Sequence, residues 1–171
     1  MSFLGKLLGR NPLSDLKEAV INLGFLADAE MDISRFYRQC TDGIEKDREF
    51  WNSLADEELV HAENARKMIE LITRYPTLYK PGISFVTTTI RMFSLEMQSL
   101  AERMSKGQIS SDDLFAIALE IEDSAIEISY GKIIKTEDRL YNSLAYQNDH
   151  ESAKHKARIV ARAQGKPISE G

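Results

Sequence analysis

The stretch Glu58-Leu59-Val60-His61 places a carboxylate and an imidazole three residues apart within a long run of helix-forming sequence. Residues at this spacing share one face of a helix. The apolar residues of the same run recur in register with the pair, at Trp51, Leu54, Ala55, Ala62, Ala65, Met68, Ile69 and Ile72. We therefore expect the pair on the buried face, where an unpaired carboxylate is costly and needs a cation or a proton as its partner.

A second carboxylate, Glu30, stands within the apolar stripe of the preceding helical run. That stripe recurs at steps of three or four residues, through Leu16, Val20, Leu23, Ala27, Glu30, Ile33 or Ser34, and Tyr37. It predicts a helix over about 14–41 with a turn at Asp42-Gly43, and a second helix over about 44–74 that Tyr75-Pro76 ends. Carboxylates and an imidazole that face inward from neighbouring helices favour a metal ion between them.

Composition restricts the class of protein. The 171 residues include 43% hydrophobic residues and only 4 prolines, which indicates one ordered domain with a substantial core. The net charge of −5 offers no basic surface, so nucleic acid is not expected as a partner. The single cysteine, Cys40, excludes an intrachain disulfide framework and a cysteine-rich zinc or iron–thiolate module, and it favours a reducing, cytoplasmic location. No apolar run reaches the roughly 18 residues that a membrane span requires.

The first ten residues form an amphipathic segment. Phe3, Leu4, Leu7 and Leu8 fall on one helical face, beside Lys6 and Arg10. Such a segment suits either docking to a membrane surface or a partner protein, or a simple lead-in to the first helix. The chain is accordingly divided into a lead-in (1–13), a helical bundle (14–163) and a polar tail (164–171).

Three more helices complete the expected architecture. Residues 83–105 are predicted to be helical, although the threonines at 87–89 are a poor helical start. Ser110 or Ser111 is expected to cap a fourth helix that reaches about Lys135, and a fifth helix is expected over about 137–163. No strand pattern competes with these helices, so the fold class is all-α.

The chain also contains an internal repeat. Asn52-Ser53-Leu54-Ala55 recurs as Asn142-Ser143-Leu144-Ala145, and each copy follows a long helix with an inward glutamate, Glu30 in the first case and Glu122 in the second. Two helical hairpins related in this way predict a four-helix bundle. The segment that joins them, about 76–110, is a crossover that contains an extra helix.

Three segments, 30–37, 54–62 and 116–127, resemble the ferritin-like superfamily, and within it the rubrerythrin-like proteins. The resemblance extends from about Leu16 to Val160. In that family a glutamate from the first and third bundle helices, and an E-x-x-H motif from the second and fourth, hold two irons. The resemblance implies terminal carboxylates at Glu30 and Glu122, a bridging carboxylate at Glu58 and an imidazole ligand at His61.

The fourth bundle helix departs from the family pattern. Aligning the two Asn-Ser-Leu-Ala tetrapeptides places Asn148 opposite Glu58 and Glu151 opposite His61. An amide would then replace one bridging carboxylate, and a carboxylate would replace the second imidazole. His155 lies one turn beyond Glu151 on the same face and would substitute as the imidazole ligand if the helix slid.

The candidate metal ligands are therefore Glu30, Glu58, His61, Glu122, Glu151 and His155. Tyr37 and Tyr130 fall on or near the same inward faces. They are either hydrogen-bonding partners of these ligands or ordinary core tyrosines. The alternative for Glu122, Glu151 and His155 is a set of buried polar residues that satisfy one another without a metal.

The leading hypothesis is a rubrerythrin-like metal-binding protein with iron in a dinuclear or mononuclear site, and manganese or zinc as alternatives. Its expected activity is reduction of peroxide or oxidation of ferrous iron, with electrons from an external donor because the chain has no thiolate iron centre. The alternative is a non-catalytic ferritin-like binding or scaffolding module that has lost its second metal site. A storage cage is a weaker third option. A homodimer is expected from the family resemblance.

Overall fold

Helices carry nearly all of the described chain, which in this computed structural model comprises residues 12–43, 45–83, 87–124 and 130–165. The long helices are α1 (Pro12–Gly43), α2 (Arg48–Arg74), α3 (Thr87–Ser105), α4 (Ser111–Glu122) and α6 (Arg139–Ala163). The shorter elements are 3-10 turns at Glu45–Asp47 and Pro76–Leu78, helix α5 (Tyr130–Ile133), and strands β1 (Lys80–Pro81) and β2 (Ile134–Lys135). The all-α prediction is confirmed for these residues, and no helix among them is both long and apolar enough to cross a membrane. The docking segment expected at 1–10 lies outside them.

The first two long helices form an antiparallel hairpin. Ser34 Oγ in α1 donates a hydrogen bond to the carbonyl oxygen of Ala55 in α2, at 2.7 Å. Nearer the start of α1, Met31 contacts Arg66, which lies further along α2. Residues late in α2 therefore meet residues early in α1, as an antiparallel pair requires.

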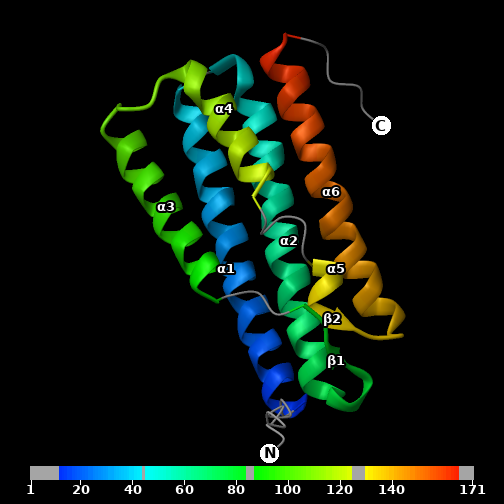
Figure 1. Cartoon of the computed structure of the whole chain (residues 1–171). Helices are drawn as coiled ribbons and strands as arrows, with labels where there is room; N and C mark the ends of the chain where they lie inside the picture. The colour runs from blue at the N-terminus through cyan, green and yellow to red at the C-terminus, as the bar shows by residue number, and fades with distance from the viewer. Residues whose placement is uncertain (1–11, 44, 84–86, 125–129, 166–171) are drawn as a thin grey trace, which may run out of the picture.

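The remaining helices complete a bundle in which α1 and α6 run in one direction and α2 and α4 in the other (Figure 1). Tyr37 contacts Glu122, and Glu30 contacts Tyr130, so α4 and the following α5 run antiparallel to α1. As α6 proceeds, its hydrogen bonds reach progressively earlier residues of α2 and then Asp47, directly before α2, which makes these two helices antiparallel as well. Helix α3 packs along α1 and brings the chain back to the end of the bundle where α4 begins. It is the helix expected within the crossover.

Two apolar clusters lie along the bundle and are separated by a buried polar layer. One cluster contains Leu26 and Ile72, and the other contains Ile33 and Trp51. The helical period turns the polar residues of each helix inward, and the contacts between the helices bring them to the same depth between these clusters. The fully buried polar side chains of this layer are Glu30, Glu58, His61, Asn148 and His155.

The fourth helix is shorter than expected. Helix α4 ends at Glu122 rather than near Lys135, and the described chain resumes at Tyr130. Helix α5 ends at Ile133 because of a long-range pairing: Pro81 and Lys80 pair with Ile134 and Lys135 in an antiparallel two-stranded sheet. Backbone groups used in that sheet cannot continue a helix. The expectation of no strand is therefore also wrong at this point.

The sheet requires a glycine next to β1. The amide nitrogen of Gly82 donates to the carbonyl oxygen of Ile133 at 2.8 Å, and the Ile83 amide donates to the Lys132 carbonyl oxygen at 2.8 Å. A Cβ atom at residue 82 would stand 2.1 Å from the Lys132 carbonyl oxygen. Only glycine allows the two backbones to approach this closely.

The other observed helix boundaries differ by a few residues from those predicted from the sequence. Ile83, the expected start of α3, is hydrogen-bonded beside the sheet, and the helix begins at Thr87 in spite of its threonines. Helix α2 begins at Arg48 after the 3-10 turn, rather than near residue 44. Helix α6 begins at Arg139 because Asp138 caps it, accepting hydrogen bonds from the amides of Leu140 and Tyr141.

Candidate metal centre

The polar layer brings together candidate ligands from four different helices. Glu30 comes from α1, Glu58 and His61 from α2, Glu122 from α4, and His155 from α6. Each of these side chains is buried, and Glu122 is the most exposed of them at 5%. The reason is the sequence pattern itself, since each residue stands in the apolar stripe of its helix and turns inward with it.

Glu58 is the centre of the cluster. Its Oε2 atom lies 2.9 Å from Nδ1 of His61, and its Oε1 atom lies 2.9 Å from Nδ1 of His155. The two imidazole rings stack with their centroids 5.2 Å apart and their planes 19° from parallel. One carboxylate oxygen of Glu58 and one nitrogen of each histidine lie within 4.8 Å of one another, so this buried group could hold a metal ion.

Each of the two flanking carboxylates accepts a hydrogen bond from a tyrosine. The hydroxyl of Tyr37 donates to Oε1 of Glu122 at 2.6 Å, and the hydroxyl of Tyr130 donates to Oε1 of Glu30 at 2.7 Å. Glu122 Oε1 also lies 3.6 Å from Nδ1 of His155. Glu122 Oε2 is buried and has no hydrogen-bond partner among the described residues, which leaves an oxygen available to a cation.

Two outer carboxylates contact the far side of the histidine rings. Glu151 Oε2 lies 3.1 Å from Nε2 of His61, and Glu57 Oε2 lies 2.7 Å from Nε2 of His155. A carboxylate at the second ring nitrogen fixes the orientation and the tautomer of a metal-binding histidine. We call Glu58, His61 and His155 the inner group. Glu151 lies at the outer nitrogen of His61 and is therefore not part of this group.

Glu57 was not among the candidates from the sequence, because its correspondence to Glu151 appears only with the register that the structure adopts. It directly precedes Glu58, just as Glu151 directly precedes Ser152, and each of the two outer carboxylates contacts the histidine of the other helix. Glu57 also pairs with Arg158, which holds it in place. The outer contacts are thus reciprocal between α2 and α6.

The register between α2 and α6 differs by one helical turn from the tetrapeptide alignment. The ring of His155, not the side chain of Glu151, stacks on His61. Asn148 does not stand opposite Glu58: its amide donates to the carbonyl oxygen of His61 at 3.1 Å and accepts from Asn64 at 2.9 Å. The alternative with a displaced helix is therefore the one that the structure adopts.

In this register His155 corresponds to His61. Ser152, three positions before His155, therefore corresponds to Glu58, three positions before His61. Ser152 is buried, and its hydroxyl donates to the carbonyl oxygen of Asn148 at 3.1 Å. The two helices therefore supply equivalent histidines and equivalent outer carboxylates, but only α2 supplies an inner carboxylate.

The side chains of the inner group shift one another's pKa values. Burial lowers the pKa of His61, but the hydrogen bond and the charge of Glu58, together with the charge of Glu30, outweigh it and raise the pKa to about 9. Burial likewise opposes the charged form of His155, while its contacts with Glu122, Glu57 and Glu58 raise its pKa far above the ordinary value. Burial would raise the pKa of Glu58, yet both histidines lower it to about 2. Without a metal the centre thus holds protons, and a bound cation would displace them.

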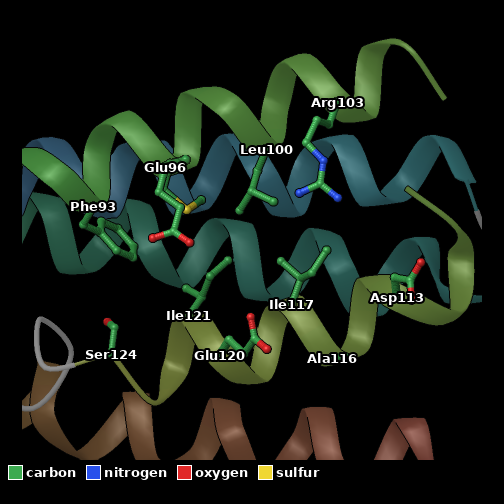
Figure 2. Close-up of a pocket in the computed structure, with 11 residues that line it drawn as sticks. Phe93, Glu96, Leu100, Arg103, Asp113, Ala116, Ile117, Glu120, Ile121 and Ser124 are labelled. Atoms are coloured by element: carbon green, nitrogen blue, oxygen red, sulfur yellow. The ribbon is translucent and has the colours of Figure 1, made fainter. Parts of the chain in front are cut away.

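A separate pocket of about 460 Å³ lies between α3 and α4 (Figure 2). Phe93 and Leu100 line it from α3, and Ile117 and Ile121 line it from α4. Its charged lining residues are Glu96, Arg103, Asp113 and Glu120. None of the candidate metal ligands lines this pocket.

No protein-family model, curated protein or solved structure matches the chain. The fold and the centre by themselves define an all-α protein with a buried carboxylate–imidazole group that could hold a metal ion.

Proposed function

We propose that the protein is a ferritin-like metalloprotein that binds iron at Glu58, His61 and His155, with Glu30 and Glu122 as further ligands. One observation carries the proposal: the buried carboxylate of Glu58 contacts the inner nitrogen of both stacked imidazoles. Burying such charged groups costs free energy, which a bound cation would offset. Carboxylate and imidazole donors together suit iron, manganese and zinc.

The direction of the helices supports the ferritin-like assignment. A hairpin (α1 and α2), a crossover with an extra helix (α3) and a second pair (α4 and α6) correspond to the ferritin-like connection pattern. In that pattern a glutamate projects inward from the first and third bundle helices, which is where Glu30 and Glu122 stand. Because His155 contacts Glu58 within the inner group, α6 still supplies an imidazole ligand. This favours the proposal over a binding module that has lost half of its ligands.

The residues present suit a metal ion. Glu122 offers a buried oxygen without a partner in the described chain, and the outer carboxylates Glu57 and Glu151 hold the two histidines with their Nδ1 atoms inward. Bound iron would supply redox chemistry toward peroxide or dioxygen. The protein would hold the ligands in place through Tyr37 and Tyr130, and the apolar clusters on either side would restrict the access of water.

The proposed activity is reduction of peroxide or oxidation of ferrous iron. Electrons for peroxide reduction would come from a separate donor protein or small reductant, because the chain has one cysteine and no cysteine-rich iron centre. A homodimer is part of the same proposal through the family resemblance.

Metal content is the direct test. The metal-free protein is loaded anaerobically with Fe²⁺, and bound metal per chain is measured after removal of excess ion, for the wild type and for Glu58→Gln. We expect at least one equivalent in the wild type and a loss of affinity of about 100-fold or more in the variant, because the shared carboxylate is removed.

His150→Ala is the matched control, because His150 lies on α6 but is exposed and stacks on Tyr146. It should bind metal as the wild type does. A wild-type protein that retains no metal, or a Glu58→Gln variant that binds as tightly as the wild type, would show that the proposal is wrong. Peroxide consumption by the loaded protein then tests the catalytic part separately.

A further inference from the structure

Helix α2 contributes a carboxylate to the inner group, but helix α6 has no carboxylate at the equivalent position. Helices α2 and α6 each carry a histidine, a residue three positions before it, and an outer carboxylate directly before that residue. The three residues are Glu57, Glu58 and His61 on α2, and Glu151, Ser152 and His155 on α6. Reciprocal contacts of the outer carboxylates, and stacking of the histidines, show that the two sets face each other. Ser152 thus takes the place of a second inner carboxylate.

We infer that the centre binds one divalent ion tightly and a second ion at least about tenfold more weakly, and that Ser152 is the residue that sets this limit. This inference rests on the proposed metal-binding function and adds to it the number of ions and its cause.

The ligand geometry favours a single ion. An oxygen of Glu58 and one nitrogen each of His61 and His155 lie within 4.8 Å of one another, so one ion can take all three. Two ions would have to divide these donors and share Glu58 as their only inner bridging carboxylate. Each ion would then hold one histidine, one oxygen of Glu58, and one flanking carboxylate, Glu30 or Glu122.

The charge of the buried layer leads to the same conclusion. Three buried carboxylates, Glu30, Glu58 and Glu122, face the centre. A first divalent ion meets an excess of negative charge, whereas a second ion leaves an excess of positive charge in a layer closed by apolar clusters. An uncompensated buried charge is strongly unfavourable. A glutamate at residue 152 would remove that excess.

The outer carboxylates do not alter this balance in the same way. Glu57 is paired with Arg158, so its charge is already compensated. The Glu151 side chain is 29% exposed, and solvent screens its charge. Ser152, in contrast, is buried at the depth of the inner group.

Stepwise titration of the metal-free protein with Mn²⁺ tests the inference, with isothermal calorimetry for affinity and EPR to distinguish isolated from coupled ions. The wild type should bind one equivalent tightly and give the spectrum of isolated Mn²⁺. Ser152→Glu should bind the second ion at least about tenfold more tightly than the wild type does, and should give the spectrum of a coupled pair. Ser152→Asp is the smaller variant for the case in which the longer side chain prevents folding, which circular dichroism reports.

Two control variants separate the effect of a carboxylate at position 152 from the effect of an added negative charge elsewhere on α6. Ser152→Ala should retain the wild-type stoichiometry, because it adds no carboxylate. Ala153→Glu adds a carboxylate at the neighbouring, exposed position of the same helix and should leave the second ion weak.

The outcomes distinguish this inference from the proposed function. A wild-type protein that binds no ion contradicts both. A wild type that binds two ions with equal affinity, or a folded Ser152→Glu protein that still binds only one, contradicts the role of Ser152 and leaves the proposed function in place.

Discussion

At the scale of single residues, the centre depends on side chains that contact the candidate ligands as much as on the ligands. Glu57 and Glu151 contact the outer nitrogens of the histidines, and Tyr37 and Tyr130 donate to the flanking carboxylates. These contacts restrict how the imidazoles and carboxylates rotate. A change in such a residue should therefore alter metal affinity without altering the fold.

Replacing Glu57 by Ala tests this role. The variant removes the acceptor at Nε2 of His155, and we expect the affinity for Fe²⁺ or Mn²⁺ to fall by about 10- to 100-fold. Competition with a chelator of known affinity measures the change. Glu49→Ala, an exposed glutamate near the start of the same helix, is the control and should bind as the wild type does. Equal affinities for the two variants would contradict the assigned role.

The pH dependence of stability provides a second prediction at this scale. In the metal-free protein the pKa of His61 is raised from 6.5 to about 9, chiefly by Glu58 against the opposing effect of burial. Because the folded pKa lies above the unfolded value, this contribution is fully present below pH 6.5 and is lost as the pH rises through 9. We expect the contribution of His61 to the free energy of unfolding to fall by on the order of 2 kcal/mol across that window, and the raised pKa of His155 to add a fall of the same sign.

Urea unfolding of the chelator-treated protein at several pH values measures this change. Glu58→Gln removes the charge that raises the pKa of His61, so its stability should depend less on pH over the same range. A wild-type unfolding free energy that stays constant from pH 6.5 to 9 would contradict the charge arrangement of the centre.

At the scale of secondary structure, the short sheet explains why the chain after α5 does not remain helical. Strands β1 and β2 pair residues that lie more than fifty positions apart, and the Gly82 amide extends this pairing. The pairing joins the end of the first hairpin to the segment that precedes α6. It therefore helps to set where α6 begins and how it is positioned against α2.

Two glycine substitutions of opposite effect test this view. Gly82→Ala places a Cβ atom 2.1 Å from a backbone oxygen, so we expect a loss of about 2 kcal/mol or more in the free energy of unfolding. Gly24→Ala has nothing within 4 Å of the added atom and lies inside α1, so it should stabilise the protein by about 0.5–1 kcal/mol. Chemical denaturation compares the two variants, and a harmless Gly82→Ala would contradict the close approach of the strands.

At the scale of the whole molecule, the polar layer divides the core of the bundle into two apolar clusters. The layer contains buried carboxylates and histidines at the depth where many bundles contain only apolar side chains. In the metal-free state ion pairs satisfy these groups at the cost of desolvation. A bound cation would connect α2 and α6 directly, and α1 and α4 through their glutamates.

Metal loading should consequently stabilise the entire bundle. At a free metal concentration about 100 times the dissociation constant, binding to the folded state alone adds about 2.7 kcal/mol, which corresponds to an increase in Tm on the order of 5–10 °C. Calorimetry with and without a chelator measures the difference. His61→Ala should abolish the increase and His150→Ala should retain it. An unchanged Tm in the wild type at saturating metal would contradict ligation across the helices.

Local sequence determines where three of the long helices lie along the chain and which of their side chains face inward. The apolar period predicts α1, α2 and α6 within a few residues of their observed bounds, because the burial of a stripe depends on spacing along one helix. The inward direction of Glu30, Glu58 and His61 follows from the same spacing. These properties belong to single helices and need no knowledge of their neighbours.

The tertiary structure decides what depends on contacts between distant segments. The end of α5 at Ile133 follows from the backbone pairing of Ile134 and Lys135 with β1, which no local propensity reveals. The register of α6 is the second example. The repeated tetrapeptide indicated Glu151 opposite His61, but packing across the helix pair brings His155 there and Ser152 three positions before it. A displacement of one turn keeps the same face of α6 inward, so the periodicity of the helix is equal for both registers and only the contacts between helices distinguish them.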